Sequence, residues 1–370
     1  MEEKIDTAIL DKERKEKALE LAEKLELPES IRTPGRTWTR YSKLDEELGD
    51  IDLKPIEPGI EVEGDADVFT GKEALEEAGD KLLDAIKMDE NRVNALHAAY
   101  MNSLVYIDAG DSKIRITYDE ESPVLAHLVV DTRRSSEVSI TEEFHGEPGL
   151  LTSFDEFYLG GNSSLSYGAV ESAEGLTYSS RKAITGRDSR MNWLNSIFEG
   201  QLSRTSIETV LKGDNSETEK IGVWYPTGEQ HTDISLKVYH IGDNTRCDMN
   251  SRAVVDDKAR SIYEGLQDVG DKADDTSSFQ REQVLMLSDD AEVDASPKLM
   301  IENPDVKASH AASAGNLPKD KVHYLESRGL SRRKAERLIV KGFFEPVMES
   351  IELPELKESI RKEVQKKLDE

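Results

Sequence analysis

The stretch Gly213 to Asn244 decides the fold: GDNSETEKIGVWYPTGEQHTDISLKVYHIGDN. It begins and ends with the same polar turn, Gly-Asp-Asn, and a second break, Pro226-Thr-Gly228, lies near its middle. The run that follows the first turn, Lys220 to Trp224, is short and leads directly into that second break. Short runs bounded by Gly, Pro and Asn clusters predict β-strands. One repeat of this kind therefore contains two strands and two turns.

The Gly-polar-polar turn recurs at nearly constant spacing along the middle of the chain. Successive glycines are separated by 25, 27, 29 and 28 residues. The turns are Gly161-Asn-Ser, Gly186-Arg-Asp, Gly213-Asp-Asn, Gly242-Asp-Asn and Gly270-Asp-Lys. The strands expected after them are Leu165–Val170, Met191–Phe198, Lys220–Trp224, Cys247–Val255 and Thr276–Leu287. This period favours a coiled parallel β-solenoid, with an antiparallel sandwich as the alternative.

Helical patterns flank the β region at both ends and predict a mainly β fold with helical termini. We expect residues 1–100 to be helical and loop-rich, 101–316 to form the β-helix, and 317–370 to be helical again. The predicted helices are Asp11–Leu27, Lys72–Met88, Asn91–Tyr100, Lys319–Arg328, Arg332–Lys341 and Glu355–Leu368. Residues 29–71 read as an irregular connection, and Gly342 as the end of a helix. A solenoid has open ends, and the terminal helices are expected to cover them.

Charge and composition exclude several classes of protein. The chain of 370 residues carries 48 Lys+Arg against 76 Asp+Glu, a net charge of −28 that repels phosphate backbones and anionic lipid. No run approaches the roughly 18 apolar residues of a membrane helix, and the first residues lack a secretory pattern. We therefore expect a cytoplasmic protein that binds neither nucleic acid nor membrane. The single cysteine, Cys247, excludes an intramolecular disulfide and is expected to be a core residue.

Motifs of common enzymes are missing from the sequence. There is no P-loop, no Gly-x-Ser-x-Gly, no His-Glu-x-x-His and no Gly-x-Gly-x-x-Gly after a strand. The seven histidines show no metal-ligand spacing. His310 is distinctive because it lies in a run of small residues, Ala308 to Gly315, that lets another backbone or a ligand approach closely. The alternative is that this run is simply a tight crossing from strand to helix.

Several motifs in the C-terminal half resemble a known family. They are Ser296-Pro-Lys-Leu-Met-Ile-Glu-Asn-Pro-Asp-Val-Lys-Ala-Ser-His-Ala-Ala-Ser-Ala-Gly-Asn-Leu317, Val322-His-Tyr-Leu-Glu-Ser-Arg-Gly-Leu330, Ala335-Glu-Arg-Leu-Ile-Val-Lys-Gly-Phe343, Ala259-Arg-Ser-Ile-Tyr-Glu-Gly265 and Ala291-Glu-Val-Asp294. In this order they resemble the SufB/SufD family, the scaffold components of the SUF iron–sulfur cluster assembly machinery. The resemblance is strong over about 220 to 345.

The resemblance implies a fold, a role and partners. The family has a right-handed parallel β-helix, pairs through it, and binds the SufC-type ABC ATPase through C-terminal helices. ATP hydrolysis would then belong to the partner, and this chain would be a scaffold without catalytic activity. The chain that pairs with this one through the β-helix could be a SufB-type homologue or a second copy of this chain. The residues that match the ATPase-docking helices are Leu325, Arg328, Gly329, Leu338, Gly342 and Phe343.

The site residue implied by the resemblance is His310, as a metal ligand. SufD-type members often have Cys-Ser-His here, whereas this chain has Ala308-Ser-His310; SufB-type members have Glu-His-Glu. Thiols that SufB-type members use are absent, so the chain resembles SufD more. Iron–sulfur clusters are held mainly by thiolates. We expect no cofactor bound by this chain alone and a transient iron–sulfur cluster shared with a partner.

Three other interpretations remain at this point. One is an archaeal-style homodimeric scaffold that works without a SufD partner. Another is a β-helix enzyme acting on polysaccharides, although no groove with clustered acids and bases is evident from the sequence. The third is a purely structural solenoid without a ligand.

Overall fold

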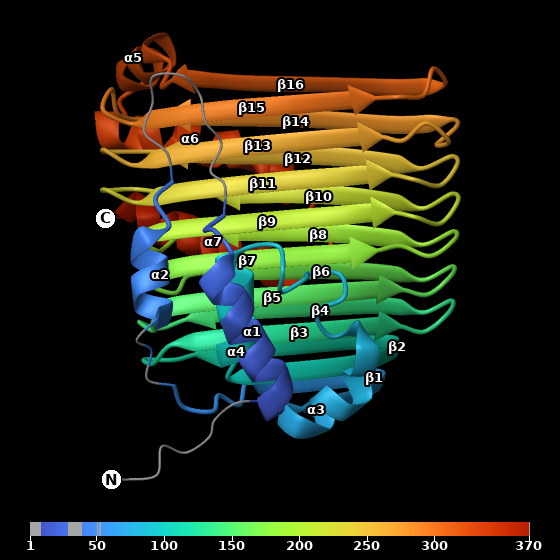
Figure 1. Ribbon diagram of the computed structural model, residues 1–370. Coiled ribbons are helices and arrows are strands. Elements are labelled where there is room, and N and C mark those ends of the chain that lie inside the picture. Colours follow the sequence, from blue (N-terminus) through green and yellow to red (C-terminus); the bar gives the residue numbers. More distant parts are fainter. Residues whose placement is uncertain (1–8, 29–38, 50, 52, 370) are drawn as a thin grey trace, which may run out of the picture.

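The computed structural model describes residues 9–28, 39–49, 51 and 53–369. Its centre is a stack of coils that is wound from β-strands, with helices on both sides (Figure 1). The strands are β1 (Gly59–Thr70), β2 (Ser103–Asp119), β3 (Val124–Thr132), β4 (Glu137–His145), β5 (Gly149–Leu159), β6 (Ser164–Glu171), β7 (Gly175–Ile184), β8 (Arg190–Ile197), β9 (Leu202–Leu211), β10 (Glu217–Trp224), β11 (His231–His240), β12 (Arg246–Val255), β13 (Arg260–Val269), β14 (Thr276–Met286), β15 (Glu292–Ile301) and β16 (Val306–Asn316).

The strand order identifies a parallel β-solenoid. From β3 to β16, each strand pairs in parallel with the strand two positions along the chain, so odd-numbered and even-numbered strands form two walls. β2 joins the walls, because its first half pairs with β3 and its second half with β4. Pairing is in register, as in the column Met191, Thr218 and Cys247 across β8, β10 and β12. The parallel β-helix predicted from the period is confirmed, and its right-handed winding stays a prediction.

The turns that mark the period have a common backbone geometry. Asn162, Asp188, Asn215 and Asn244 all have φ between 54° and 60°, in the left-handed region that Asn and Asp tolerate better than most residues. Asn side chains also bond across coils, and Asn244 Nδ2 donates to Asn215 Oδ1 at 2.8 Å. The repeated Gly-polar-polar motif therefore reflects a ladder of turns along one edge of the solenoid.

The space enclosed by the coils, here called the lumen, is filled with side chains. Trp193, Trp224 and Tyr167 are among its largest fully buried members. The lumen also holds charge: Arg181 donates from Nε to Asp155 at 2.8 Å and from Nη1 to Glu171 at 2.7 Å. Buried charges in proteins are normally paired in this way.

Most of the helices cover the outer faces of the two walls, whereas α3 lies at the N-terminal end of the solenoid. The helical elements are α1 (Lys12–Lys24), α2 (Ser42–Gly49), α3 (Gly71–Ala78), the 3-10 turn η1 (Gly79–Lys81), α4 (Arg92–Tyr100), α5 (Lys319–Ser327), α6 (Arg332–Glu349) and α7 (Pro354–Asp369). The α2 and α4 helices pack with α1 on β3, β5, β7 and β9. The α6 and α7 helices pack on β6 to β14 of the other wall (Figure 1). The Leu356 side chain of α7 lies so close to Gly168 of β6 that a Cβ there would stand 2.0 Å from it.

The two ends of the solenoid differ, which corrects the expectation that terminal helices cover both. At the N-terminal end, β1 pairs antiparallel with β2, and α3 packs against both strands. At the other end lie β15 and β16, the last strands of the two walls. Helices were expected there because an exposed strand edge invites association. The apolar faces of α6 and α7 pack instead against the wall of even-numbered strands.

Three predicted boundaries were wrong. The helix expected over Lys72–Met88 ends at Ala78, because Gly79 adopts a φ of 54°. The stretch 29–71 contains α2 and β1, with residues 29–38, 50 and 52 lying outside the described ones. Gly342 does not end a helix: α6 continues to Glu349, since its second half buries Phe344, Val347 and Met348.

Candidate functional site

The uncovered end of the solenoid, formed by β15 and β16, is the first candidate site. These strands are the two ends of the strand order, and no other described strand pairs with their outer edges. A free strand edge is a template for pairing with another chain. Apolar side chains are exposed here as well: Met300 is 53% and Ile301 is 42% exposed. This end, which we call the open end, therefore has the character of an association surface.

His310 faces the lumen at the open end. It lies on β16 in register with Gln280 of β14, which is buried. Paired residues of neighbouring strands point to the same face of a sheet, so His310 stands over Gln280 as the next layer. Ala308 and Ala312, two positions away on either side, share that face. His310 is exposed, with only small neighbours on its own strand face.

A polar layer lies directly beneath His310. Gln280 donates to the Tyr263 hydroxyl at 3.3 Å, and its amide oxygen lies 3.3 Å from the amide nitrogen of Gln267. Glu282, two residues further along β14, is 1% exposed, and neither carboxylate oxygen has a hydrogen-bond partner among the described residues. Burial raises the pKa of Glu282 to about 8.

Sequence reasoning found His310 but missed Glu282. The signal was present, because Thr276, Ser278, Gln280 and Glu282 alternate along the strand expected at Thr276–Leu287. Alternation alone assigns Glu282 to the lumen. Acidic residues are so frequent in this chain, however, that the position of one of them does not by itself indicate a site. Whether His310 binds a metal stays a prediction.

The second candidate site is the outer surface of α5 and α6. Leu338 on α6 is 52% exposed, and Arg328 and Gly329, just after α5, are exposed too. Tyr324 on α5, which the sequence reasoning missed, is 57% exposed. The guanidinium of Arg328 stacks over the Tyr324 ring at 5.2 Å from its centroid. We call Tyr324, Arg328 and Leu338 the helical patch.

The other predicted partner residues have different surroundings. Gly342 is exposed on α6, whereas Leu325 is only half-exposed. Phe343 packs against the apolar layer between α6 and the wall. Arg252 of β12 lies over the Phe343 ring and donates to its carbonyl. Phe343 therefore attaches α6 to the solenoid.

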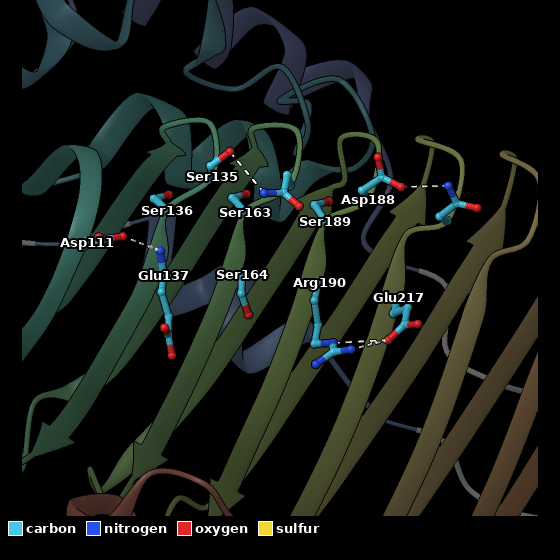
Figure 2. Close-up of a pocket in the computed structure, with 12 residues that line it drawn as sticks. Asp111, Ser135, Ser136, Glu137, Ser163, Ser164, Asp188, Ser189, Arg190 and Glu217 are labelled. Atoms are coloured by element: carbon cyan, nitrogen blue, oxygen red, sulfur yellow. Dashed lines mark hydrogen bonds and ion pairs between the residues drawn. The ribbon is translucent and has the colours of Figure 1, made fainter.

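A groove of about 600 Å³ runs along the ladder of turns (Figure 2). Its polar groups are largely bonded to one another. Arg190 pairs with Glu217 at 2.7 Å, and Asn215 donates to Asp188 at 2.7 Å. Asp111 accepts from the backbone N–H of Glu137 at 2.9 Å. The polar groups of the groove therefore serve to hold the turns together. Nothing in the groove favours an enzyme acting on polysaccharides.

Cys247 is a lumen residue, as expected. It is 3% exposed, and burial raises the pKa of its thiol to about 12. A neutral thiol is neither a good nucleophile nor a metal ligand. In the part of the chain that the structure describes, no three His, Cys, Asp or Glu side chains are clustered so that they could hold a metal ion. No helix of that part is long and apolar enough to cross a membrane.

Comparisons with known proteins place the chain in a family. The family described as "SUF system FeS cluster assembly, SufBD core domain" matches residues 115–343. The iron–sulfur cluster assembly protein SufD of Bacillus subtilis is 29% identical over 300 residues, covering 77% of this chain and 69% of that protein. A SufBD family protein of Synechocystis sp. is 24% identical over 265 residues, covering 66% of this chain and 58% of that protein.

A third relative, a SufBD family protein of Mycobacterium leprae, is 25% identical over 190 residues and aligns over 48% of its own length. The family match includes both candidate sites, since it runs from β2 through the middle of α6. The solenoid, its open end and the matched residues together show that this chain belongs to the SufBD family of SUF iron–sulfur cluster assembly proteins and is SufD-like within it.

Proposed function

We propose that this chain is a non-catalytic scaffold subunit of iron–sulfur cluster assembly. It pairs through the open end with a SufB-type chain and carries a SufC-type ABC ATPase on its C-terminal helices. The observation that supports this most directly is the open end itself, where two strand edges, Met300 and His310 are exposed together. The proposal places the growing cluster, the cargo of the assembly, between the two chains.

The sulfur ligands of that cluster come from the partner chain. The only cysteine here is buried with a raised thiol pKa, so this chain offers one imidazole, that of His310, and no thiolate. Imidazole alone is a poor substitute for a set of cysteines. A partner with thiols at the same end would complete the ligand set.

The helical patch is the proposed ATPase contact. Tyr324 and Leu338 are large, exposed and apolar, and aromatic residues and arginine are enriched in protein interfaces. The tail also differs in charge from the rest, with 13 Lys+Arg against 11 Asp+Glu over residues 317–370. A nearly neutral surface avoids the repulsion that the strongly acidic body would exert on an acidic partner.

Anaerobic copurification from cell extract with tandem-tagged full-length protein tests the proposal. We expect an ABC ATPase and a cysteine-bearing SufBD homologue to be recovered with the wild type. Met300→Asp should remove the homologue and keep the ATPase, whereas Leu338→Ser with Tyr324→Ser should do the reverse. Val62→Asp and Val62→Ser are the matched controls, because Val62 is an exposed apolar residue on β1 at the other end.

Light scattering on the purified chain decides between the two kinds of partner. A stable pair formed by this chain alone, and broken by Met300→Asp, would replace the SufB-type partner with a second copy. Recovery of neither ATPase nor homologue, in an extract where a known scaffold recovers both, would refute the assignment.

A further inference from the structure

Glu282 is an isolated acid inside the solenoid. It is almost completely buried on β14, yet both of its carboxylate oxygens lack a hydrogen-bond partner in the described chain. Buried polar groups in proteins nearly always have partners, and a single unsatisfied carboxyl group is costly. The other large polar groups of this layer, Gln280 and Tyr263, are hydrogen-bonded to each other. Of the large polar groups in this layer, Glu282 is therefore the one without a hydrogen-bond partner in the described chain.

The way from Glu282 to solvent runs through the open end. Its register partner on β16 is Ala312, whose side chain is small and exposed. On the opposite wall, Ala295 and Pro297 of β15 occupy the lumen-facing positions next to Tyr263 and Gly265. No further coil follows in the described chain. The carboxyl group thus lies one layer below the surface, beneath small side chains.

His310 lies within reach of the same place. It is the residue on β16 two positions before Ala312 and faces the lumen like it. With neighbouring strands about 4.8 Å apart and a rise of about 3.3 Å per residue, the Cα atoms of Glu282 and His310 lie about 8 Å apart. Two long side chains at that separation can bind one ion between them. Neither residue alone is a site, but together they supply one oxygen and one nitrogen ligand.

We propose that Glu282 and His310 together bind a divalent iron ion at the open end, with Glu282 as the oxygen ligand from below. Carboxylate and imidazole suit Fe(II), Mn(II) and Co(II), and water or a partner's groups can fill the remaining positions. The net charge of −28 favours cation entry. The choice of iron rests on the proposed function, whereas binding of the ion is a property of this chain alone.

Titration of tag-free, full-length protein with Co(II) tests the inference, with Mg²⁺ in excess to occupy weak surface carboxylates. Calorimetry gives the affinity, and proton NMR shows whether a hyperfine-shifted imidazole N–H signal appears. We expect Glu282→Gln and His310→Ala each to weaken binding by about tenfold or more. The shifted signal should be absent in His310→Ala. Glu302→Gln is the matched control, because Glu302 is exposed at the same end.

A second variant covers the case in which Glu282→Gln fails to fold. Ala312→Leu retains both ligands and fills the space above Glu282 from an exposed position, so it should also abolish Co(II) binding. Binding by Glu282→Gln or by Ala312→Leu with wild-type affinity would overturn the inference, as would a wild type without a His310-derived signal. The Glu282→Gln variant should still recover the ATPase in the copurification experiment. If it does, an overturned metal site leaves the proposed scaffold role intact.

Discussion

Lys220 places an ammonium group inside the lumen, where its surroundings favour the neutral amine. Its Nζ donates to the carbonyl oxygens of Ile207 at 3.0 Å and Lys237 at 2.8 Å, across to the opposite wall. Burial lowers the pKa of Lys220 from its ordinary value of 10.5 to about 7. Between these two values the unfolded chain binds a proton that the folded chain does not. Stability from this residue is therefore present above pH 10.5 and is lost as the pH falls toward 7.

Lys220→Met removes this pH dependence. We expect the variant to be less stable than the wild type at pH 9.5, because it lacks two hydrogen bonds worth about 1 kcal/mol each. When the pH is lowered to 7.5, the free energy of unfolding of the wild type should fall relative to that of the variant by on the order of 2 to 3 kcal/mol. Each pH unit in this range corresponds to about 1.4 kcal/mol. Urea unfolding of both proteins at the two pH values measures it. If the two proteins differed in free energy of unfolding by the same amount at both pH values, the low pKa of Lys220 would be contradicted.

The repeated turn can be tested with two substitutions at one position. Asn215 has a φ of 58°, and its side chain donates to Asp188 and accepts from Asn244. Asn215→Ala and Asn215→Gly both remove these bonds, but only glycine adopts the left-handed backbone without strain. We expect the alanine variant to be less stable than the glycine variant by about 1 kcal/mol.

Thermal or urea unfolding of both variants checks this expectation. An alanine variant as stable as the glycine variant would mean that the turn relaxes to another backbone conformation. Ser164→Ala serves as a control, because Ser164 is only partly buried and follows a turn without occupying its left-handed position.

Elements built from local patterns could be predicted, and those built from distant contacts could not. The strands of the solenoid follow two-residue alternation and turn residues, which are visible within ten residues. β1 also alternates, with Ile60, Val62, Ala66 and Val68 between acidic residues, but it pairs with β2 some 45 residues away, so its place in the sheet could not be predicted locally. The continuation of α6 through Gly342 depends on the wall against which Phe344 and Val347 pack.

The same division applies to the candidate sites. His310 could be predicted because its small neighbours and the family motifs are local. Glu282 and Tyr324 become notable only in three dimensions: one because the chain leaves its carboxyl group without a partner, the other because no described element covers it. Phe343 was assigned to a partner, although it also contacts Arg252 of this chain.

At the scale of the whole molecule, stability should vary along the solenoid. A coil contacts mainly its neighbours, so central coils are held from both sides and the open end from one. We expect backbone amides of β15 and β16 to exchange with deuterium faster than those of β6 and β8, which α7 and the adjacent coils cover. Hydrogen-exchange mass spectrometry measures this gradient. Addition of the proposed partner should slow exchange in β15 and β16, and uniform protection without the partner would contradict it.

The unequal ends have a consequence for stoichiometry. A strand stack with two free ends could add chain after chain and grow into a fibre, because head-to-tail contacts that do not close propagate without limit. Here the N-terminal end carries the antiparallel strand β1 and the helix α3, so it presents a different surface from the two parallel strands of the open end. Two chains that meet at their open ends leave only the unlike N-terminal ends exposed. The proposed pairing of open end with open end therefore joins two chains and does not by itself extend to a third.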